Sequence, residues 1–241
     1  MKITIATGPT FPVPAVRGGA VQRMWHGLAK EFAKRGHEVT MFARAFPGQP
    51  ENENRDGIRI LRWGGFDQGT NIRVDLMKGL LYGLGAVGKV PAGDVIITND
   101  FWLPVLLPRM RPRVGKVVAS IARFPKGQFW LYHGVDKILA VSAAVAEGIR
   151  KQTPAIAGKV GYVPNCVDEE FLRDSGVKGL RGSGTAKLTV LYVGRIHPEK
   201  GVELLLEAWT TVLSQKGLGS LRESGAKLRI VGPWRKEHGV S

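Results

Sequence analysis

Residues 188–209 read LTVLYVGRIHPEKGVELLLEAW, and this stretch decides the fold that the sequence predicts. Residues 188–193 form a continuous apolar, β-rich run, which is typical of a parallel strand buried on both faces. Gly194 ends the run, and Pro198 suits the first turn of a helix. Over residues 200–213, apolar side chains then recur at helical spacing. The repeating residues are Val202, Leu205, Leu206 and Trp209. The stretch therefore predicts a strand, a loop and a helix.

Arg195 and Lys200 lie where this predicted loop meets the helix. A helix start has free backbone N–H groups, and its dipole favours an anion. The planar fork of Arg and the compact charge of Lys could together hold both phosphates of a nucleotide-sugar and offset the charge on a departing diphosphate. The alternative is that both are solvated charges, with Lys200 paired to Glu203 or Glu207 along the helix. The residue types alone leave both interpretations open.

The string VGRIHPEKGVELLLEAW resembles the Gly-Arg-x(4)-Lys-Gly signature of retaining glycosyltransferases of family 4, which have the two-domain GT-B fold. In that family the Arg and the Lys bind the donor diphosphate, so the resemblance implies this role for Arg195 and Lys200. Gly194 and Gly232, each at the end of a predicted strand, are further candidates for nucleotide binding.

The predicted second domain comprises residues 187–241, with strands at residues 188–193 and 227–231 around one helix. That is about 55 residues, whereas domains typically have about 100 or more. Members of the family continue with a segment whose E-x(7)-E motif grips the donor sugar and the ribose, and this sequence stops before that segment. We therefore expect a C-terminally truncated chain that is inactive alone.

The N-terminal segment has a similar organisation. Residues 3–6 predict a first parallel strand and residues 20–35 a helix, with Gly18 and Gly19 between them. Two glycines let the backbone approach a ligand, as in phosphate-binding turns, although a simple tight turn is the commoner cause. With the following GHEVT at residues 36–40, this segment resembles the opening of the same family. The resemblance implies that Gly18 and Gly19 face the donor phosphates, across a cleft from the cationic pair of the second domain.

Further strands and helices alternate along the chain. Strands are predicted at residues 38–43, 58–63, 94–98, 117–121, 137–141 and 160–163, and helices at residues 76–87 and 143–151, with a polar loop at residues 46–56. Ser142 is placed to cap the second of these helices. The alternation predicts an α/β fold of GT-B type. Its parts are a complete N-terminal Rossmann-like domain with a doubly wound parallel sheet (1–173), a Gly/Ser-rich linker (174–186) and the first β-α-β portion of a C-terminal nucleotide-sugar-binding domain (187–241).

Ligands of such sheets bind beyond the carboxyl ends of the strands. Asn99, Arg123 and Lys126 follow predicted strands there and are candidates for the acceptor side, and Asp100 follows Asn99. Family members often have a His after the strand at residues 117–121, but this sequence has IARFP around Arg123. His133 lies nearby in sequence, and a lone His is more often a surface residue than a catalyst.

Cys166 is the one cysteine of the chain, which excludes an internal disulfide. It lies in PNCVD, which resembles the Pro-Asn-Gly-Val-Asp turn of the family, with Cys in place of Gly. Because a non-glycine residue at positive φ is costly, either Cys166 avoids that conformation or the turn is altered.

The formal net charge is +15, which favours an anionic partner. The basic stretch, residues 101–135, has six cations and no acid: Arg109, Arg111, Arg113, Lys116, Arg123 and Lys126. It predicts contact with an anionic membrane face or a phosphorylated acceptor, with the stretch from Arg109 to Lys126 facing the acceptor side. The absence of zinc-finger spacing, an RNP-type string and a bZIP heptad argues against nucleic acid. Because the sequence shows no signal-peptide pattern and no apolar run of about 20 residues, we expect a cytoplasmic protein, peripheral at the inner face of the membrane.

Together these patterns predict an enzyme that transfers a sugar from a nucleoside-diphosphate sugar to an acceptor hydroxyl with retention, in the synthesis of cell-envelope glycan, glycolipid or polysaccharide. No cofactor is expected, since the sequence has no Asp-x-Asp motif and no His/Cys ligand cluster that would imply a metal. The motifs identify no protein nucleophile. Two other classes remain: a non-catalytic Rossmann-like fragment that binds an anion or nucleotide, and a basic binder of membrane or nucleic-acid surfaces.

Overall fold

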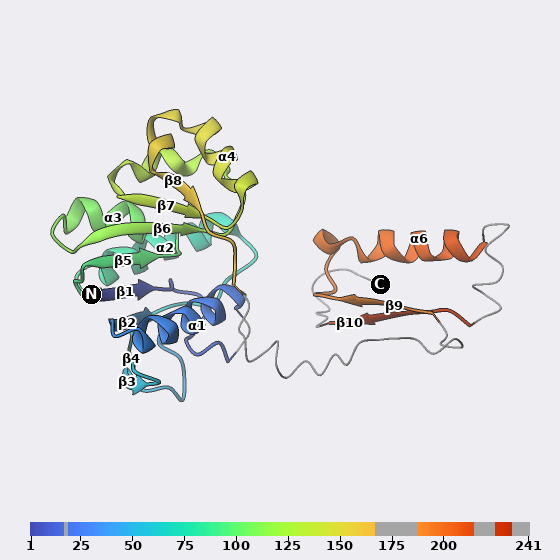
Figure 1. Cartoon of the computed structure of the whole chain (residues 1–241), viewed down its shortest axis with the longest axis horizontal. Coiled ribbons are helices and arrows are strands. Elements are labelled where there is room, and N and C mark those ends of the chain that lie inside the picture. The colour runs from blue at the N-terminus through green and yellow to red at the C-terminus, as the bar shows by residue number, and fades with distance from the viewer. Residues whose placement is uncertain (17–18, 167–187, 215–224, 233–241) are drawn as a thin grey trace. The chain divides into compact units, whose positions relative to one another are not determined.

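The computed structural model describes residues 1–16, 19–166, 188–214 and 225–232 (Figure 1). The chain divides into two compact units, residues 1–175 and 176–241. Each unit is described by itself below. No helix in the described part of the chain is long and apolar enough to cross a membrane.

The first unit is built on an eight-stranded sheet with the strand order β3-β4-β2-β1-β5-β6-β7-β8. Its strands are β1 Lys2–Ala6, β2 Glu38–Ala43, β3 Asn52–Arg55, β4 Ile58–Arg62, β5 Val95–Thr98, β6 Lys116–Ile121, β7 Lys137–Ala140 and β8 Val160–Tyr162. All neighbours pair in parallel except β3, which runs antiparallel to β4 at the edge. Order and direction place the carboxyl ends of seven strands along one edge, as the alternating sequence pattern predicts.

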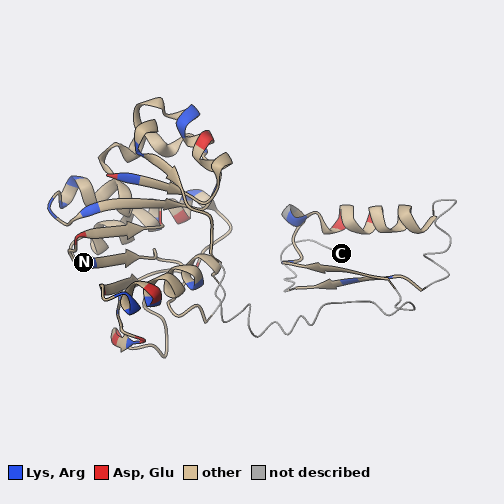
Figure 2. Ribbon diagram, in the orientation of Figure 1, with Lys and Arg blue, Asp and Glu red and all other residues tan. Residues whose placement is uncertain are grey.

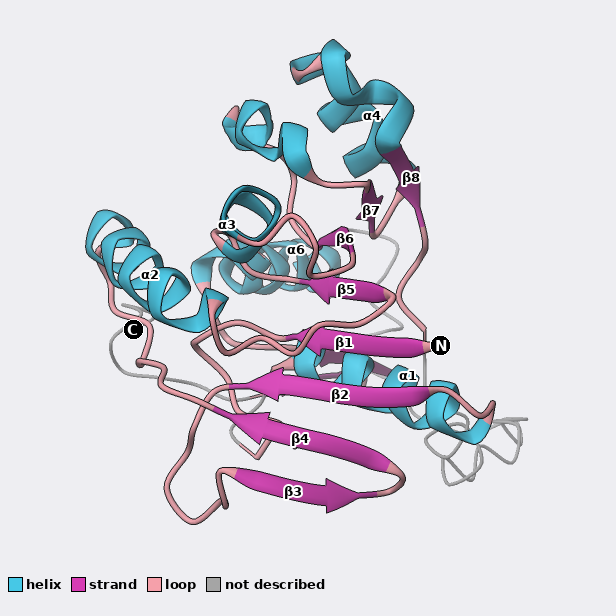
Figure 3. Cartoon of the chain, turned by 90° about the vertical axis from the view of Figure 1, so that its left-hand side faces the viewer, coloured by secondary structure: helices cyan, strands magenta, loops and turns pink. Residues whose placement is uncertain are grey.

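Helices cover both faces of this sheet (Figures 1 and 3). One face is packed against α1 Ala20–Lys34, and its core includes Ile5, Trp25 and Met41. The other face is packed against α2 Ile72–Val87, α3 Leu103–Met110, η1 Gln128–Gly134, α4 Ala143–Gln152 and η2 Pro154–Lys159. Adjacent strand residues such as Met41 and Phe42 enter opposite cores, because successive side chains of a strand point to opposite faces.

The main differences from the sequence prediction in the first unit concern β3, α2 and α3, together with the short helices η1 and η2, which the sequence pattern did not predict. The polar loop predicted at residues 46–56 contains the edge strand β3, whose exposed NENR sequence has no apolar alternation to signal it. The helix predicted to begin at Leu76 begins at Ile72, because the Asn71 side chain accepts from the backbone N–H of Arg73 at 3.0 Å and caps it. The third is α3, a helix with two prolines that the sequence pattern did not predict.

The second unit contains a parallel pair, β9 Thr189–Val193 and β10 Lys227–Val231, with η3 Pro198–Lys200 and α6 Val202–Ser214 between them. Figure 1 shows α6 along one face of the pair, and alternate strand residues are half-buried. The prediction that β9 is buried on both faces is therefore wrong for the described residues, since Leu191 and Val193 are exposed. The helix begins at Val202, two residues later than predicted, because Gly201 adopts φ +65° and separates it from η3.

Candidate functional site

The loop after β1 is anchored through its carbonyl groups by polar side chains from distant parts of the chain. Gln22 Nε2 donates to Thr7 O at 3.2 Å, and Arg44 Nη1 donates to Thr10 O at 2.8 Å. The Arg62 guanidinium donates to Val13 O through Nε (3.2 Å) and Nη2 (2.9 Å). These contacts fix the path of the loop that leads to the start of α1.

Gly19 is the residue before α1, with φ +98°. A Cβ at this position would lie 2.7 Å from Gln22 Oε1 and 3.3 Å from Phe11 Cβ. The left-handed conformation and this close packing explain a glycine here without a ligand, so the diphosphate role of Gly19 stays a prediction. Gly18 lies outside the described residues.

Asn99 follows β5 and is used by the protein itself. In the amide orientation that satisfies both groups, Nδ2 donates to Thr7 O at 3.0 Å and Oδ1 accepts from Trp25 Nε1 at 3.2 Å. The side chain therefore ties the loop after β1 to α1. Its predicted place on the acceptor side of the site is not tested by these contacts.

Asp100, the next residue, is a carboxylate at the carboxyl edge of the sheet. Its Oδ2 accepts from the backbone N–H of Trp102 (3.1 Å) and of Leu103 (3.2 Å), which caps α3. Its Oδ1 is buried without a hydrogen-bond partner among the described residues. Burial raises the pKa of Asp100 to about 6. Burial, and next the Asp100 charge, also raise the pKa of the Tyr82 hydroxyl.

Arg123 and Lys126 lie in the loop after β6 and are exposed. Gln152, the last residue of α4, holds this loop: Nε2 donates to Pro125 O at 3.0 Å, and Oε1 accepts from Gly127 N at 2.7 Å. The structure thus presents both cations at the carboxyl edge of the sheet, where the sequence predicts the acceptor side. Their role in acceptor binding stays a prediction.

The six cations of the basic stretch lie in separate segments of the first unit, among the Lys and Arg positions coloured in Figure 2. Arg109 donates to Val105 O and Leu131 O, and Arg111 donates to Val87 O and Val90 O, so both guanidinium groups satisfy carbonyl groups of the protein. Arg113 and Lys116 lie at the amino end of β6, the opposite edge from Arg123 and Lys126. The strand β6 lies between the cations at its amino end and those in the loop after its carboxyl end. The run of like charges in the sequence is therefore divided between the two edges of the sheet.

The second unit carries the predicted diphosphate-binding residues in the loop between β9 and α6. Gly194 N donates to Val231 O at 3.0 Å where the two strands end. Any Cβ at Gly232 would collide with the backbone carbonyl of Gly194. These two glycines therefore allow the ends of β9 and β10 to approach each other closely. They lie at the carboxyl end of the parallel pair, the edge at which such folds bind ligands.

Arg195 and Lys200 lie in this same loop with exposed side chains. The Tyr192 hydroxyl donates to Arg195 O at 3.1 Å, and Lys200 N donates to His197 O at 2.8 Å within the turn η3. In the described part of the chain no ion pair joins Lys200 to Glu203 or Glu207. The structure thus brings the two cations into one short loop beside the first turn of α6, and it does not test whether they bind a diphosphate.

Other predicted features of the site have plain outcomes. His133 is exposed on η1. Cys166 is exposed. Among the described residues Asp56 is the non-glycine residue with positive φ, so Cys166 does not adopt the left-handed conformation. No group of three or more His, Cys, Asp or Glu residues in those ranges could hold a metal ion.

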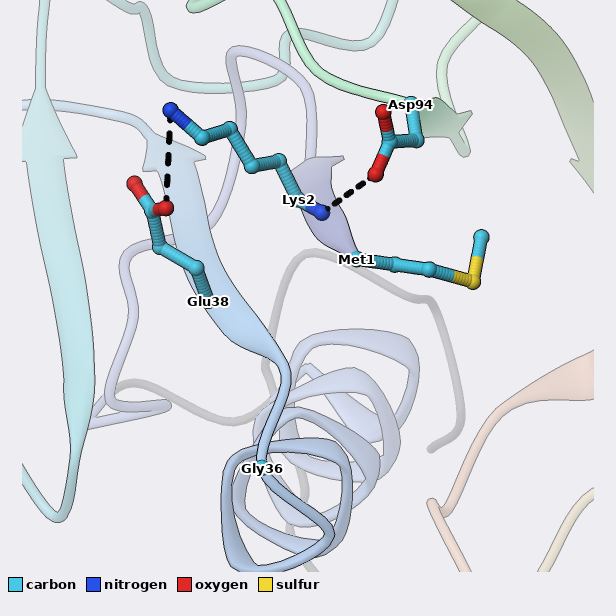
Figure 4. A pocket seen from close by; sticks show the side chains of 5 residues that line it. All are labelled: Met1, Lys2, Gly36, Glu38 and Asp94. Carbon is cyan, nitrogen blue, oxygen red and sulfur yellow. Dashed lines mark hydrogen bonds and ion pairs between the residues drawn. The ribbon is translucent and has the colours of Figure 1, made fainter.

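A shallow depression of about 400 Å³ lies at the amino edge of the sheet (Figure 4). Lys2 N donates to Asp94 Oδ2 at 2.7 Å, and Lys2 Nζ lies 3.6 Å from Glu38 Oε2. Met1 and Gly36 complete its lining. Because parallel α/β sheets bind ligands at the carboxyl edge, we do not assign the function to this depression.

The contacts that anchor the loops after β1 and β6 were not predicted from the sequence. Arg44, Arg62 and Gln152 each bind a loop that is far away in sequence, and a single Arg or Gln after a strand or helix has no local signature. The available signal was positional, since Arg44 directly follows a strand that the sequence predicts.

Comparison with known proteins adds a family. The model of Glycosyltransferase Family 4 matches residues 17–171. Spore coat protein SA of Bacillus subtilis strain 168 is 25% identical over 237 residues, which cover 89% of this chain and 58% of that protein. An α,α-trehalose-phosphate synthase (UDP-forming) from Burkholderia xenovorans, in complex with glucose-6-phosphate, matches with a TM-score of 0.71 at 13% identity. The match covers 98% of this chain and 67% of the synthase chain.

A trehalose-6-phosphate structure from E. coli, bound with UDP-2-fluoro glucose, has a TM-score of 0.67 at 10% identity over 98% of this chain and 65% of that one. These solved structures are GT-B glycosyltransferases, so the predicted α/β fold of GT-B type is confirmed. The chain spans 58% of the length of spore coat protein SA and about two thirds of these structures.

Proposed function

The chain belongs to glycosyltransferase family 4, and from this premise we propose that it takes part in the transfer of a sugar from a nucleoside-diphosphate sugar to an acceptor hydroxyl, with retention of anomeric configuration, an activity that residues 1–241 are not expected to show alone. The observation that carries the proposal is the loop between β9 and α6. It exposes Arg195 and Lys200 together at the carboxyl end of a parallel pair of strands. The acceptor is proposed to belong to cell-envelope glycan, glycolipid or polysaccharide synthesis.

The loop has three kinds of group that suit a diphosphate. The backbone N–H groups of the first turn of α6, which starts at Val202, have no carbonyl partner one turn earlier in the helix, and the helix dipole adds positive potential there. Arg195 supplies a planar fork for two phosphate oxygens, and Lys200 supplies a compact charge. Gly194 and Gly232 allow the ends of β9 and β10 to approach each other closely, because a Cβ at Gly232 would collide with the Gly194 carbonyl.

In this proposal the same groups act in catalysis. When the sugar leaves, negative charge grows on the departing diphosphate, and fixed cations and backbone dipoles stabilise that charge more than they stabilise the bound donor. We propose that no metal ion or other cofactor is required. The E. coli structure of the same fold is bound with UDP-2-fluoro glucose, which supports a nucleoside-diphosphate sugar as donor.

Arg195→Ala is expected to weaken the binding of UDP or GDP by about 1.5 to 3 kcal/mol, or roughly 10- to 150-fold, since it removes a charged hydrogen-bond donor. Isothermal titration calorimetry on the 241-residue chain measures this directly. Lys200→Ala is expected to weaken binding in the same direction.

Arg229→Ala is the matched control, because Arg229 is an exposed cation of β10 outside the loop and its loss changes the net charge equally. Its affinity for UDP or GDP should stay close to that of the unchanged chain. Equal affinities of the Arg195→Ala and Arg229→Ala variants would remove Arg195 from the diphosphate site.

A further inference from the structure

Helix α2 has an exposed apolar face in the first unit. Its inner face is buried through Gly79, Tyr82, Gly83, Ala86 and Val87. The opposite face exposes Val74 (47%), Met77 (61%), Leu81 (65%) and Leu84 (45%). The spacing of three, four and three residues places these four side chains in one stripe along the helix, about 15 Å long at 1.5 Å per residue.

The packing of α2 explains why its larger side chains point outward. A Cβ on Gly79 would lie 3.2 Å from Trp102 Cδ1, and one on Gly83 would lie 2.9 Å from Leu106 Cδ1. Small residues on the inner face therefore let α2 lie close against α3, as Figure 3 shows. Helices that are apolar all round are normally buried or in contact with lipid, so an outer stripe of this kind calls for a partner.

Cations border this stripe, and no carboxylate does. Arg73 and Lys78 are exposed on the same side of α2, and neither forms an ion pair within the described residues. Lys78 Nζ lies 5.9 Å from the centre of the Phe66 ring. Asp75, the acidic residue of the helix, accepts from Gly69 N through both carboxylate oxygens, at 3.1 and 3.0 Å. The face thus combines aliphatic side chains with uncompensated positive charge.

We propose that the α2 face, defined as Val74, Met77, Leu81 and Leu84 with Arg73 and Lys78, docks onto the surface of an anionic lipid bilayer. A helix that exposes a stripe of aliphatic side chains with Lys or Arg at its border can lie in the headgroup region, where the aliphatic groups enter the acyl boundary and the cations meet anionic headgroups. The two bordering cations favour this occupant, because an anionic bilayer surface attracts Lys and Arg side chains that lie near it.

The position of α2 relates membrane docking to the carboxyl edge of the sheet. The helix follows the loop after β4, so its first turn lies at the carboxyl edge of the sheet, the edge where Arg123 and Lys126 are exposed. A bilayer held against α2 would present a lipid-linked acceptor to that edge. This use rests on the proposed transferase function, whereas the docking itself does not.

The test is co-sedimentation of the 241-residue chain with vesicles of equal parts phosphatidylcholine and phosphatidylglycerol, compared with phosphatidylcholine alone. The chain should pellet with the anionic vesicles. Leu81→Glu and Met77→Glu should each lower the partition coefficient about tenfold or more, because the inserted side chain loses its apolar environment. Both side chains are exposed, so circular dichroism should show a folded helix in both variants.

Two matched controls make the result specific. Leu204→Glu changes charge and size identically at an exposed leucine of α6 and should leave vesicle binding unaltered. Arg73→Gln with Lys78→Gln should lower binding about tenfold, whereas Arg113→Gln with Lys116→Gln, exposed cations at the amino edge, should not. Equal binding of the Leu81→Glu and Leu204→Glu variants would overturn the proposal. A lipid-free dimer that Leu81→Glu dissociates would also overturn it, because the face would then join two copies of the chain.

Discussion

Arg62→Ala is expected to lower the free energy of unfolding of the first unit by about 3 to 5 kcal/mol, the range for removing one partner of a buried ion pair. The Arg62 side chain is 1% exposed. Its Nη2 donates to Glu53 Oε2 at 2.7 Å, its Nη1 donates to Pro50 O at 2.7 Å, and Nε and Nη2 reach Val13 O. Removing the guanidinium leaves a carboxylate and two carbonyl groups without these donors. Hydrogen exchange of the β4 amides measures the loss in the intact chain.

Arg55→Ala is the matched control, because Arg55 Nη1 lies 3.8 Å from the other oxygen of the same carboxylate but its side chain is 54% exposed. An exposed pair of this kind contributes about 0 to 1 kcal/mol, so this variant should remain close to the unchanged protein. A similar loss in both variants would mean that burial of Arg62 does not determine its contribution.

The Arg62 contact also bears on function, because Val13 belongs to the loop that precedes α1. Two of the loop's carbonyl groups are fixed by arginines that follow or end neighbouring strands, Arg44 at Thr10 and Arg62 at Val13. Loss of Arg62 should therefore make the loop before Gly19 less well ordered, as well as destabilise the edge of the sheet.

The sequence predicts the strands well, because buried parallel strands are continuous apolar runs. The predicted bounds of β2 and β10 agree with the structure residue for residue. The polar edge strand β3 contacts only one neighbour in the sheet, β4, and has no apolar run to predict it. Helix α3 was missed because prolines at 104 and 108 suggest a break, although proline is tolerated in a first helical turn and α3 ends two residues after Pro108.

In the candidate site, too, local features could be predicted from the sequence and contacts between distant residues could not. The placement of Arg195 and Lys200 in one loop was predictable because they lie five residues apart in one strand–loop–helix unit, whereas their diphosphate role, implied by the family resemblance, stays a prediction. The contacts that shape the loop after β1 join residues far apart in sequence, such as Arg62 with Val13, separated by 49 positions. Such pairs exist only once the strand order is set, and no local pattern predicts that order. The division of the basic stretch between the two edges of the sheet has the same cause.

Asp100→Asn is expected to remove a decline in the stability of the first unit between about pH 4 and pH 6. Burial raises the pKa of this carboxyl from 3.8 to about 6 in the folded protein. The folded state therefore holds the proton more tightly than the unfolded state does, and protonation favours folding at low pH. As the pH rises through this window the contribution is lost. Since one pKa unit corresponds to about 1.4 kcal/mol, the loss is at most about 3 kcal/mol.

The Asn side chain isolates the ionisation from the cap of α3. Its amide oxygen can still accept from the N–H groups of Trp102 and Leu103, which Asp100 Oδ2 meets at 3.1 and 3.2 Å. The quantity to compare is the slope of unfolding free energy with pH, measured by denaturant titration between about pH 4 and 7, because absolute stability also changes with the new amide nitrogen. Parallel slopes for the Asp100→Asn variant and the unchanged protein would mean that water reaches Oδ1 in the folded state and that its burial does not hold the proton.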